Sequence, residues 1–435
     1  MSRTLPTTAS DLQGTVRLAT EATTGITDLV EAVHERVARL PGLPPPGRAG
    51  RTRGITGWVY RSVRGVTHLV GGSAEALLGL LPARPTQPTH PARLPSPRRE
   101  ALVAAVNGVL GDHLAASGNP LAITMAVRQA GRPLTLERAA LAQALPQASG
   151  HVLLCIHGLC MNDLQWAQRG HDHGATLAGA LGCTTLYLHY TSGQPVATTG
   201  RELASRLEAL CAAWPVPLQR LTLLGHSMGG LLARSAVFEA QQAGHRWPAA
   251  LTDMVFLGTP HHGAPLERAG HGVDVLLSAL PYAAPFARLG KVRSAGITDL
   301  RHGDLRASRQ AGRGTAAARR ATRPPAVPLP AGVHCYALAS TLGDSADALQ
   351  GRVLGDGLVP LDSALGRHPD PARALDIPPA HQWVGVGIGH LALLSDAGVA
   401  EQLQAWLSGA DGGEGGERAL PKGVQGGPES PPVTP

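Results

Sequence analysis

The segment Gly225-His-Ser-Met-Gly229 constrains the fold of this chain more than any other feature. It follows the apolar run Leu221–Leu224 and precedes a helical pattern over Leu231–Gln242. A serine in a G-x-S-x-G pattern between a strand and a helix sits on a tight turn, and the two glycines remove side chains that would clash across it. The turn lifts the Ser227 hydroxyl above the sheet, at a helix N-terminus that favours negative charge. We therefore predict that Ser227 is a nucleophile and not a structural turn residue.

Short apolar runs alternate with helical patterns on both sides of this motif. Strands are predicted at residues 151–157, 184–190, 221–225, 254–259 and 333–338. Continuous apolar strands separated by helices indicate a parallel sheet that is covered on both faces. We predict an α/β protein with a mostly parallel central sheet and flanking helices.

The residues that would assist a serine nucleophile follow it in the chain, first an acid and then a histidine. Asp356 lies in the Gly355-Asp-Gly-Leu-Val-Pro360 loop, and His390 lies in a loop before a final helix that runs to about Leu407. We expect His390 to accept the proton of Ser227 and Asp356 to orient the imidazole. Other residues remain alternatives, namely Asp344 and Asp362 for the acid and His381 and His368 for the base.

Two backbone N–H groups are expected to bind the oxyanion. One belongs to Met228, directly after the nucleophile, and the other belongs to Leu159 in the loop after the strand at 151–157. His261 and His262 follow another predicted strand and are expected to line the pocket or to position the next segment. No third ligand at metal-binding spacing accompanies them, so no metal or other cofactor is expected.

These motifs together resemble a known family. The chain contains HGL at 157–159, GHSMGG at 225–230, GTPHHG at 258–263, GDGLVP at 355–360 and GHLALL at 389–394. This set resembles bacterial lipases and esterases of the α/β-hydrolase superfamily, and most nearly the inositol deacylases that act on glycosylphosphatidylinositol anchors. The resemblance covers residues 150–408 and implies the same triad and the same oxyanion residues. Cys160 stands close to where many lipases carry a glycine.

The rest of the chain divides by composition. Residues 1–98 are predicted to form a helical extension with Pro-rich linkers, its helices spanning residues 9–40 and 55–81. The hydrolase domain is predicted at 99–408, with a lid or insertion at 261–331, where the strand–helix alternation breaks. The Gly-, Glu- and Pro-rich tail at 409–435 is predicted to be disordered.

Composition limits the other function classes. The net charge is +7, but no nucleic-acid-binding motif accompanies it, so no nucleic-acid partner is expected. Five cysteines without disulfide-like spacing fit a reducing compartment, and the N-terminus lacks the apolar run of a secretory signal. A cytoplasmic protein is expected, with peripheral membrane contact through the N-terminal helices as a further possibility. The oligomeric state is left open.

The sequence therefore predicts an esterase or lipase that acts on a small-molecule or lipid ester through an acyl-enzyme. Two alternatives stay open. The same triad can transfer an acyl group to an alcohol or thiol acceptor. Alternatively, the N-terminal helices can make the chain a membrane- or granule-binding protein for which the hydrolase domain is a scaffold.

Overall fold

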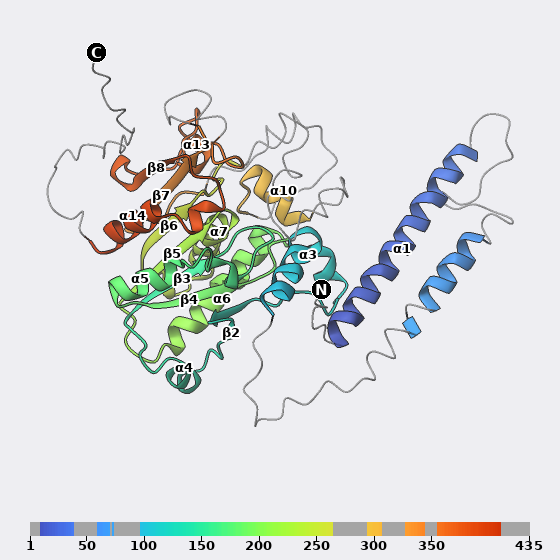
Figure 1. Cartoon of the computed structure of the whole chain (residues 1–435), viewed down its shortest axis with the longest axis horizontal. Helices are drawn as coiled ribbons and strands as arrows, with labels where there is room; N and C mark the ends of the chain where they lie inside the picture. Colours follow the sequence, from blue (N-terminus) through green and yellow to red (C-terminus); the bar gives the residue numbers. More distant parts are fainter. Residues whose placement is uncertain are drawn as a thin grey trace, which may run out of the picture.

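The computed structural model describes residues 9–38, 59–69, 72–73, 96–263, 294–306, 327–343 and 355–409. Its central feature is an eight-stranded sheet with the order β2-β1-β4-β3-β5-β6-β7-β8 (Figure 1). The strands are β1 (Ala126–Gln129), β2 (Arg132–Pro133), β3 (His151–Ile156), β4 (Thr184–His189), β5 (Arg220–His226), β6 (Leu251–Leu257), β7 (His334–Thr341) and β8 (Gln382–Val386). Strands β3 to β8 pair in parallel, and β1 runs antiparallel to both β2 and β4.

Helices cover both faces of this sheet. The α-helices are α1 (Ala9–Ala38), α3 (Pro97–Ala116), α4 (Arg138–Ala144), α5 (His173–Leu181), α6 (Val196–Ala213), α7 (Met228–Ala243), α10 (Ala295–His302), α13 (Leu361–Ala364) and α14 (Ala397–Leu407), with a further helix at 59–69. Short 3-10 helices are η1 (Asp163–Trp166), η2 (Trp247–Ala250), η3 (Pro379–His381) and η4 (Ala392–Leu394).

The core lies on the two faces of the sheet because successive residues of a strand point to opposite sides. In β3, Val152 and Leu154 belong to the apolar cluster that includes α6, whereas Leu153 and Cys155 belong to the cluster that includes α5 and α14. This two-sided burial explains why the parallel strands read as continuous apolar runs.

The N-terminal helices project from the body of the molecule (Figure 1). The first turns of α1 contact α3, where Asp11 pairs with Arg99, and Asn119 Nδ2 donates to Gly14 O at 3.1 Å. Farther along, Arg64 in the helix at 59–69 pairs with Asp28 of α1. Among the described residues, no helix is both long enough and apolar enough to cross a membrane.

The predicted parallel sheet with flanking helices is confirmed. The sequence did not predict the β1–β2 hairpin. Of the predicted insertion, α10 is described, whereas residues 264–293 and 307–326 lie outside the described residues, as do 410–435 of the predicted tail. The domain boundaries stay a prediction.

Candidate active site

Ser227 stands on a strained turn between β5 and α7. Its φ of 54° and ψ of −123° are backbone angles that residues other than glycine rarely adopt. The flanking glycines make this turn possible, because a Cβ at Gly225 would lie 2.6 Å from Gly230 Cα and one at Gly229 would lie 2.7 Å from His157 O. The bond from Ser227 N to Leu257 O, 2.8 Å, fixes the turn to the end of β6. The structure therefore holds the serine at the carboxyl edge of the parallel strands.

Asp356 and His390 form a buried pair at the same edge. His390 Nδ1 lies 2.6 Å from Asp356 Oδ2, and both side chains are almost fully buried. The other carboxylate oxygen, Oδ1, accepts hydrogen bonds from Leu358 N at 3.0 Å and Val359 N at 2.8 Å. These two N–H groups hold the carboxylate in place. Oδ2 faces the imidazole, while Oδ1 accepts both backbone hydrogen bonds.

The loop around Asp356 depends on Gly355. This residue has a φ of +54°, and a Cβ there would overlap Val359 O and lie 2.7 Å from Val359 C. A larger residue would therefore open the turn that supplies the Val359 N–H. Gly355, the first glycine of the GDGLVP segment, thus shapes the loop that binds the Asp356 carboxylate.

His390 and Ser227 adjoin the same piece of backbone. The His390 ring lies 4.8 Å from the ring of His226, the residue before the serine. A Cβ at Gly258 would lie 3.2 Å from His390 Cε1, and Ser227 N bonds to the preceding Leu257 O. Within the described residues, Ser227 Oγ makes no hydrogen bond to His390, as is common in catalytic sites without a ligand. Proton transfer between them therefore needs a movement that brings Ser227 Oγ and the imidazole within hydrogen-bond distance.

Leu159 and Met228 present backbone donors beside the serine. In the part of the chain that the structure describes, neither N–H donates a hydrogen bond to a protein acceptor. The loop before Leu159 approaches closely, since a Cβ at Gly158 would lie 3.1 Å from Ser227 Cβ. Two buried donors without acceptors, next to a strained serine, are what an oxyanion site requires.

The alternatives that the structure describes make other contacts. His368 meets the ring of His262 edge to face, and His381 packs against Tyr336, whereas His390 carries the bond to Asp356. Asp362 is on α13, and Asp344 lies outside the described residues.

His261 contacts α7, and His262 contacts the loop after α13. His261 is buried against Arg234, with Nη1 to Nδ1 at 3.2 Å, and His262 Nε2 lies 3.0 Å from Gly366 O. Burial lowers the pKa of His262 to about 4. Among the described residues, no cluster of three or more His, Cys, Asp or Glu side chains is arranged to hold a metal ion.

Two supporting residues, Ser192 and His226, were missed from the sequence. Ser192 Oγ accepts a hydrogen bond from Cys160 N at 2.9 Å, which fixes the turn after Leu159. Cys160, which the sequence had singled out, has a φ of 57°, a conformation for which glycine is the usual residue. His226 Nε2 lies 3.1 Å from His390 O. Of the two missed residues, His226 lies inside the GHSMG motif and so carried a sequence signal, whereas Ser192 carried none.

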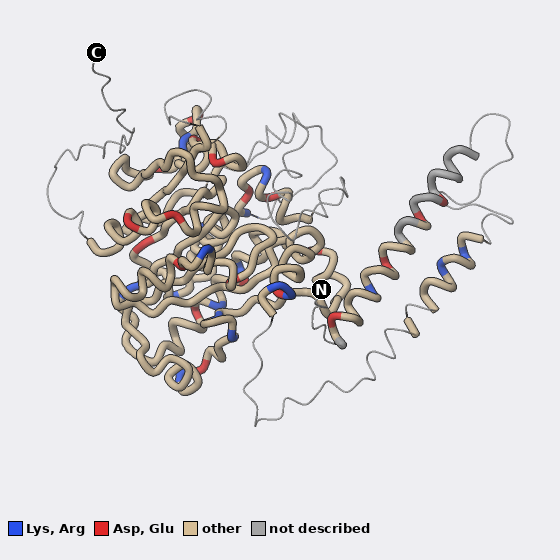
Figure 2. The backbone as a smooth tube through the Cα atoms, in the orientation of Figure 1, with Lys and Arg blue, Asp and Glu red and all other residues tan. Residues whose placement is uncertain are grey.

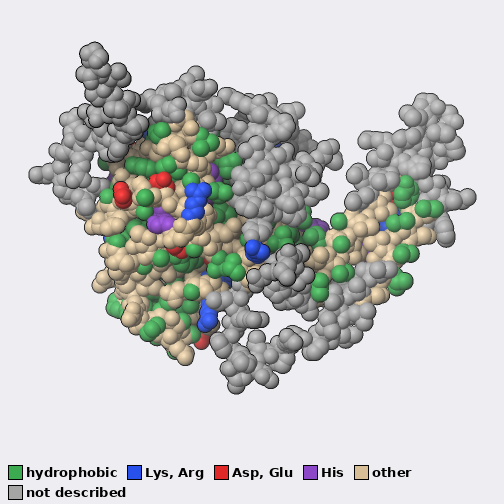
Figure 3. Space-filling model, in the orientation of Figure 1, with side chains coloured by type: hydrophobic (Ala, Val, Ile, Leu, Met, Phe, Trp, Pro, Cys, Tyr) green, Lys and Arg blue, Asp and Glu red, His purple; other side chains and the backbone are tan. Residues whose placement is uncertain are grey.

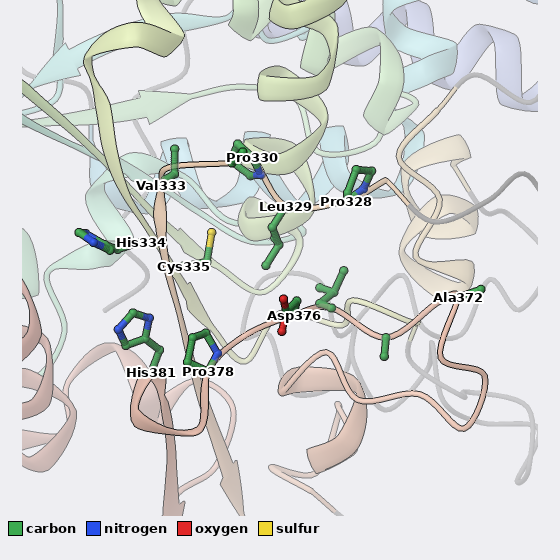
Figure 4. Close-up of a pocket in the computed structure, with 13 residues that line it drawn as sticks. Pro328, Leu329, Pro330, Val333, His334, Cys335, Ala372, Asp376, Pro378 and His381 are labelled. Carbon is green, nitrogen blue, oxygen red and sulfur yellow. The ribbon is translucent and has the colours of Figure 1, made fainter. Parts of the chain in front are cut away.

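A cavity of about 500 Å³ lies away from this site (Figure 4). It is lined by residues that include His334 and Cys335, which begin β7. Since the parallel strands carry Ser227 and His390 at their carboxyl ends, this cavity lies at the opposite edge of the sheet. It is therefore separate from the candidate active site.

Comparisons with known proteins agree with this geometry in part. Residues 202–306, which include Ser227, match the model of the PGAP1-like alpha/beta domain family. No curated protein matches the sequence. Among solved structures, the mature lipase BlEst2 of Bacillus licheniformis is similar, with 16% identity and a TM-score of 0.38, over 66% of this chain and 96% of that one.

Two further structures are similar at the same level. The ester-hydrolase EH1AB1 from the metagenome of Lake Arreo has 14% identity and a TM-score of 0.37, over 61% of this chain and 76% of that one. Aspergillus fumigatus lipase B has 12% identity and a TM-score of 0.35, over 65% of this chain and 56% of that one. These values are too low to assign an activity. By its strand order and the position of its serine turn, the chain has the α/β-hydrolase fold, with a PGAP1-like α/β segment at residues 202–306.

Proposed function

We propose that this protein is a serine hydrolase that cleaves carboxylic esters through an acyl-enzyme on Ser227. The observation that carries the proposal is the buried 2.6 Å contact between His390 Nδ1 and Asp356 Oδ2, beside a serine held at a φ of 54°. A nucleophile, a base and an orienting acid are the three parts that acyl transfer by serine needs.

The first half of the reaction forms the acyl-enzyme. His390 Nε2 takes the proton of Ser227 Oγ as the oxygen attacks the ester carbonyl carbon. The carbonyl oxygen becomes negative and accepts hydrogen bonds from the Leu159 and Met228 N–H groups. The tetrahedral intermediate then expels the alcohol, which leaves with the proton from His390. Asp356 stabilises the imidazolium throughout and stays ionised.

The second half returns the enzyme to its starting state. A water molecule gives its proton to His390 Nε2 and attacks the acyl carbon. The same two N–H groups hold the second oxyanion. Ser227 Oγ then leaves as the acid forms and recovers the proton from His390. The sum is one ester and one water converted to one acid and one alcohol.

The substrate class is an ester with an apolar acyl chain. Leu159, Met228 and Leu393 belong to one buried apolar cluster, and Leu393 packs against Gly258 at the site. The surroundings of Ser227 are thus apolar, and an acyl chain placed there would gain about 0.8 kcal/mol for each CH₂ removed from water.

Active-site labelling tests the proposal. A fluorophosphonate probe should modify Ser227, located by mass spectrometry of the digested protein, and Ser227→Ala should abolish both labelling and turnover of p-nitrophenyl esters. Thermal unfolding of the variant checks that it is folded. Turnover that survives in Ser227→Ala, or a label on another residue, would refute the mechanism.

Hydrolysis is distinguished from acyl transfer in the same assay. With p-nitrophenyl butyrate and increasing amounts of an alcohol or thiol, a hydrolase releases butyrate as the main product. A transferase yields mainly the new ester or thioester. The chain-length preference comes from a series of p-nitrophenyl esters.

A further inference from the structure

The helix at 59–69 points its apolar side chains toward solvent. Val59, Val63, Val66 and Leu69 are 44%, 42%, 60% and 70% exposed. Their spacing of four, three and three residues places them on one side of the helix. A helix of a water-soluble domain normally turns such a stripe toward its core. This arrangement is therefore the reverse of the usual one.

The polar side of the same helix is the side that packs on α1. Arg64 is only 12% exposed and pairs with Asp28 at 2.8 Å and Glu31 at 2.7 Å. Glu31 and Thr27 of α1 are themselves buried. Removing charged groups from water costs free energy, and this cost offsets much of the attraction between paired ions. These ion pairs therefore contribute little to the association of the two helices in water. Among the described side chains, buried polar groups therefore lie between the two helices, while the valines and the leucine of the helix at 59–69 face away from α1.

The positive charge of the chain is concentrated in the same region. Residues 1–98 contain twelve arginines and six acidic residues, so they carry +6 of the chain's +7. On the described part of the extension, Arg61 and Arg64 lie on the helix at 59–69 (Figure 2). An exposed apolar stripe on a strongly basic segment has the composition of a helix that lies on an anionic lipid surface.

We propose that the apolar stripe of the helix at 59–69 docks on an anionic lipid bilayer. The valines and the leucine would enter the boundary between headgroups and acyl chains. The exposed Arg61 and the net charge of +6 on residues 1–98 would attract the lipid phosphates, whereas Arg64 keeps its pairs with Asp28 and Glu31. Hydrophobic side chains line the projecting helices, clear of the catalytic body (Figure 3). A second copy of the chain is the poorer occupant, because two segments of charge +6 repel each other.

The contacts of α1 with α3 would connect the lipid-bound helices to the catalytic body. Asp11 pairs with Arg99 at the start of α3, and Arg17 donates to Ser117 O just after its end. Both ends of α3 are thus joined to α1. The inference does not depend on the proposed ester hydrolysis, because binding is measured without turnover.

Co-sedimentation with vesicles tests the proposal. The full-length protein should bind vesicles of phosphatidylglycerol and phosphatidylcholine more tightly than vesicles of phosphatidylcholine alone, and 0.5 M NaCl should weaken the binding. The variant Val63→Ser/Val66→Ser should bind about tenfold more weakly, because two exposed apolar groups no longer enter the bilayer. Val66→Trp should bind more tightly, a gain that misfolding does not explain.

Leu102→Ser is the matched control. Leu102 is an apolar residue on α3, 39% exposed, and its change should leave vesicle binding as in the wild type. Equal binding of the double-serine variant and the wild type would overturn the proposal, as would equal loss in Leu102→Ser. A wild-type dimer that becomes monomeric in the double-serine variant, without vesicle binding in either, would assign the stripe to contact between copies instead.

Discussion

Gly108 of α3 supports the candidate oxyanion site through a contact that a single methyl group should disturb. A Cβ at this position would overlap Cys160 Sγ and lie 2.9 Å from Cys160 Cα. Rotating the thiol away does not relieve the second contact, because Cα belongs to the backbone. We therefore expect Gly108→Ala to displace the turn that carries the Leu159 N–H.

The expected loss of activity exceeds the loss of stability. Alanine in place of glycine stabilises a helix by about 1 kcal/mol, while overpacking a filled interior costs about 1–3 kcal/mol. The net decrease in the free energy of unfolding should be about 1 kcal/mol, the difference between these effects. Loss of an oxyanion donor lowers kcat by about 10²–10³-fold. A displaced Leu159 N–H should thus lower kcat by about 10–100-fold with little change in KM, since the charge develops only in the transition state.

Steady-state kinetics with p-nitrophenyl butyrate and urea unfolding measure both effects. Gly108→Ala/Cys160→Gly should recover part of the lost kcat, because it removes the thiol and places glycine at a φ of 57°, while the contact with the Cα of residue 160 stays. Gly179→Ala in α5 is the control. A Cβ there meets no atom within 4 Å, so stability should rise by about 1 kcal/mol without a change in kcat. A folded Gly108→Ala variant with the wild-type kcat would refute the reasoning.

Three further predictions follow from buried charges. Asp356→Asn should lower kcat by about 10³-fold or more, measured with the same ester, because the amide no longer stabilises the imidazolium of His390. Arg128→Met should lower the free energy of unfolding in urea by about 3 kcal/mol, because it leaves the buried carboxylates of Glu100 and Asp163 without this partner. Burial lowers the pKa of His157 to about 3, so below pH 6.5 the unfolded chain binds the proton that the folded chain excludes. His157 should therefore contribute about 1.4 kcal/mol per pH unit to the fall in stability toward pH 3. His157→Gln should reduce the total slope by that amount and leave the contributions of the other buried histidines.

The sheet and the serine turn were predictable because their physics is local. A strand buried on both faces must be apolar throughout, and β3 to β7 satisfy this over most of their length. The parallel direction then brings the loops after β3, β5 and β8 to one edge. Leu159, Ser227 and His390 could therefore be expected close together without any knowledge of their distances.

Other features depend on contacts between distant segments. β1 is short and has one buried residue, Val127, so its sequence carries no strand signal. Its Arg128 pairs with Glu100 and Asp163, each about 30 residues away, and no local pattern indicates this. The choice of Asp356 among three aspartates likewise required the distance to His390.

Helix α3 begins beside the predicted boundary at residue 98 and makes contacts with residues on both sides of it. Its first turn carries Arg99, which pairs with Asp11 of α1. Its middle carries Gly108, whose missing side chain leaves room for the strained Cys160 turn. A single rigid helix thus contacts both the projecting helices and the turn beside the candidate oxyanion donors. Closely packed interiors transmit small displacements. We therefore expect a displacement of α1 to affect the Cys160 turn through α3, independently of which substrate the site binds.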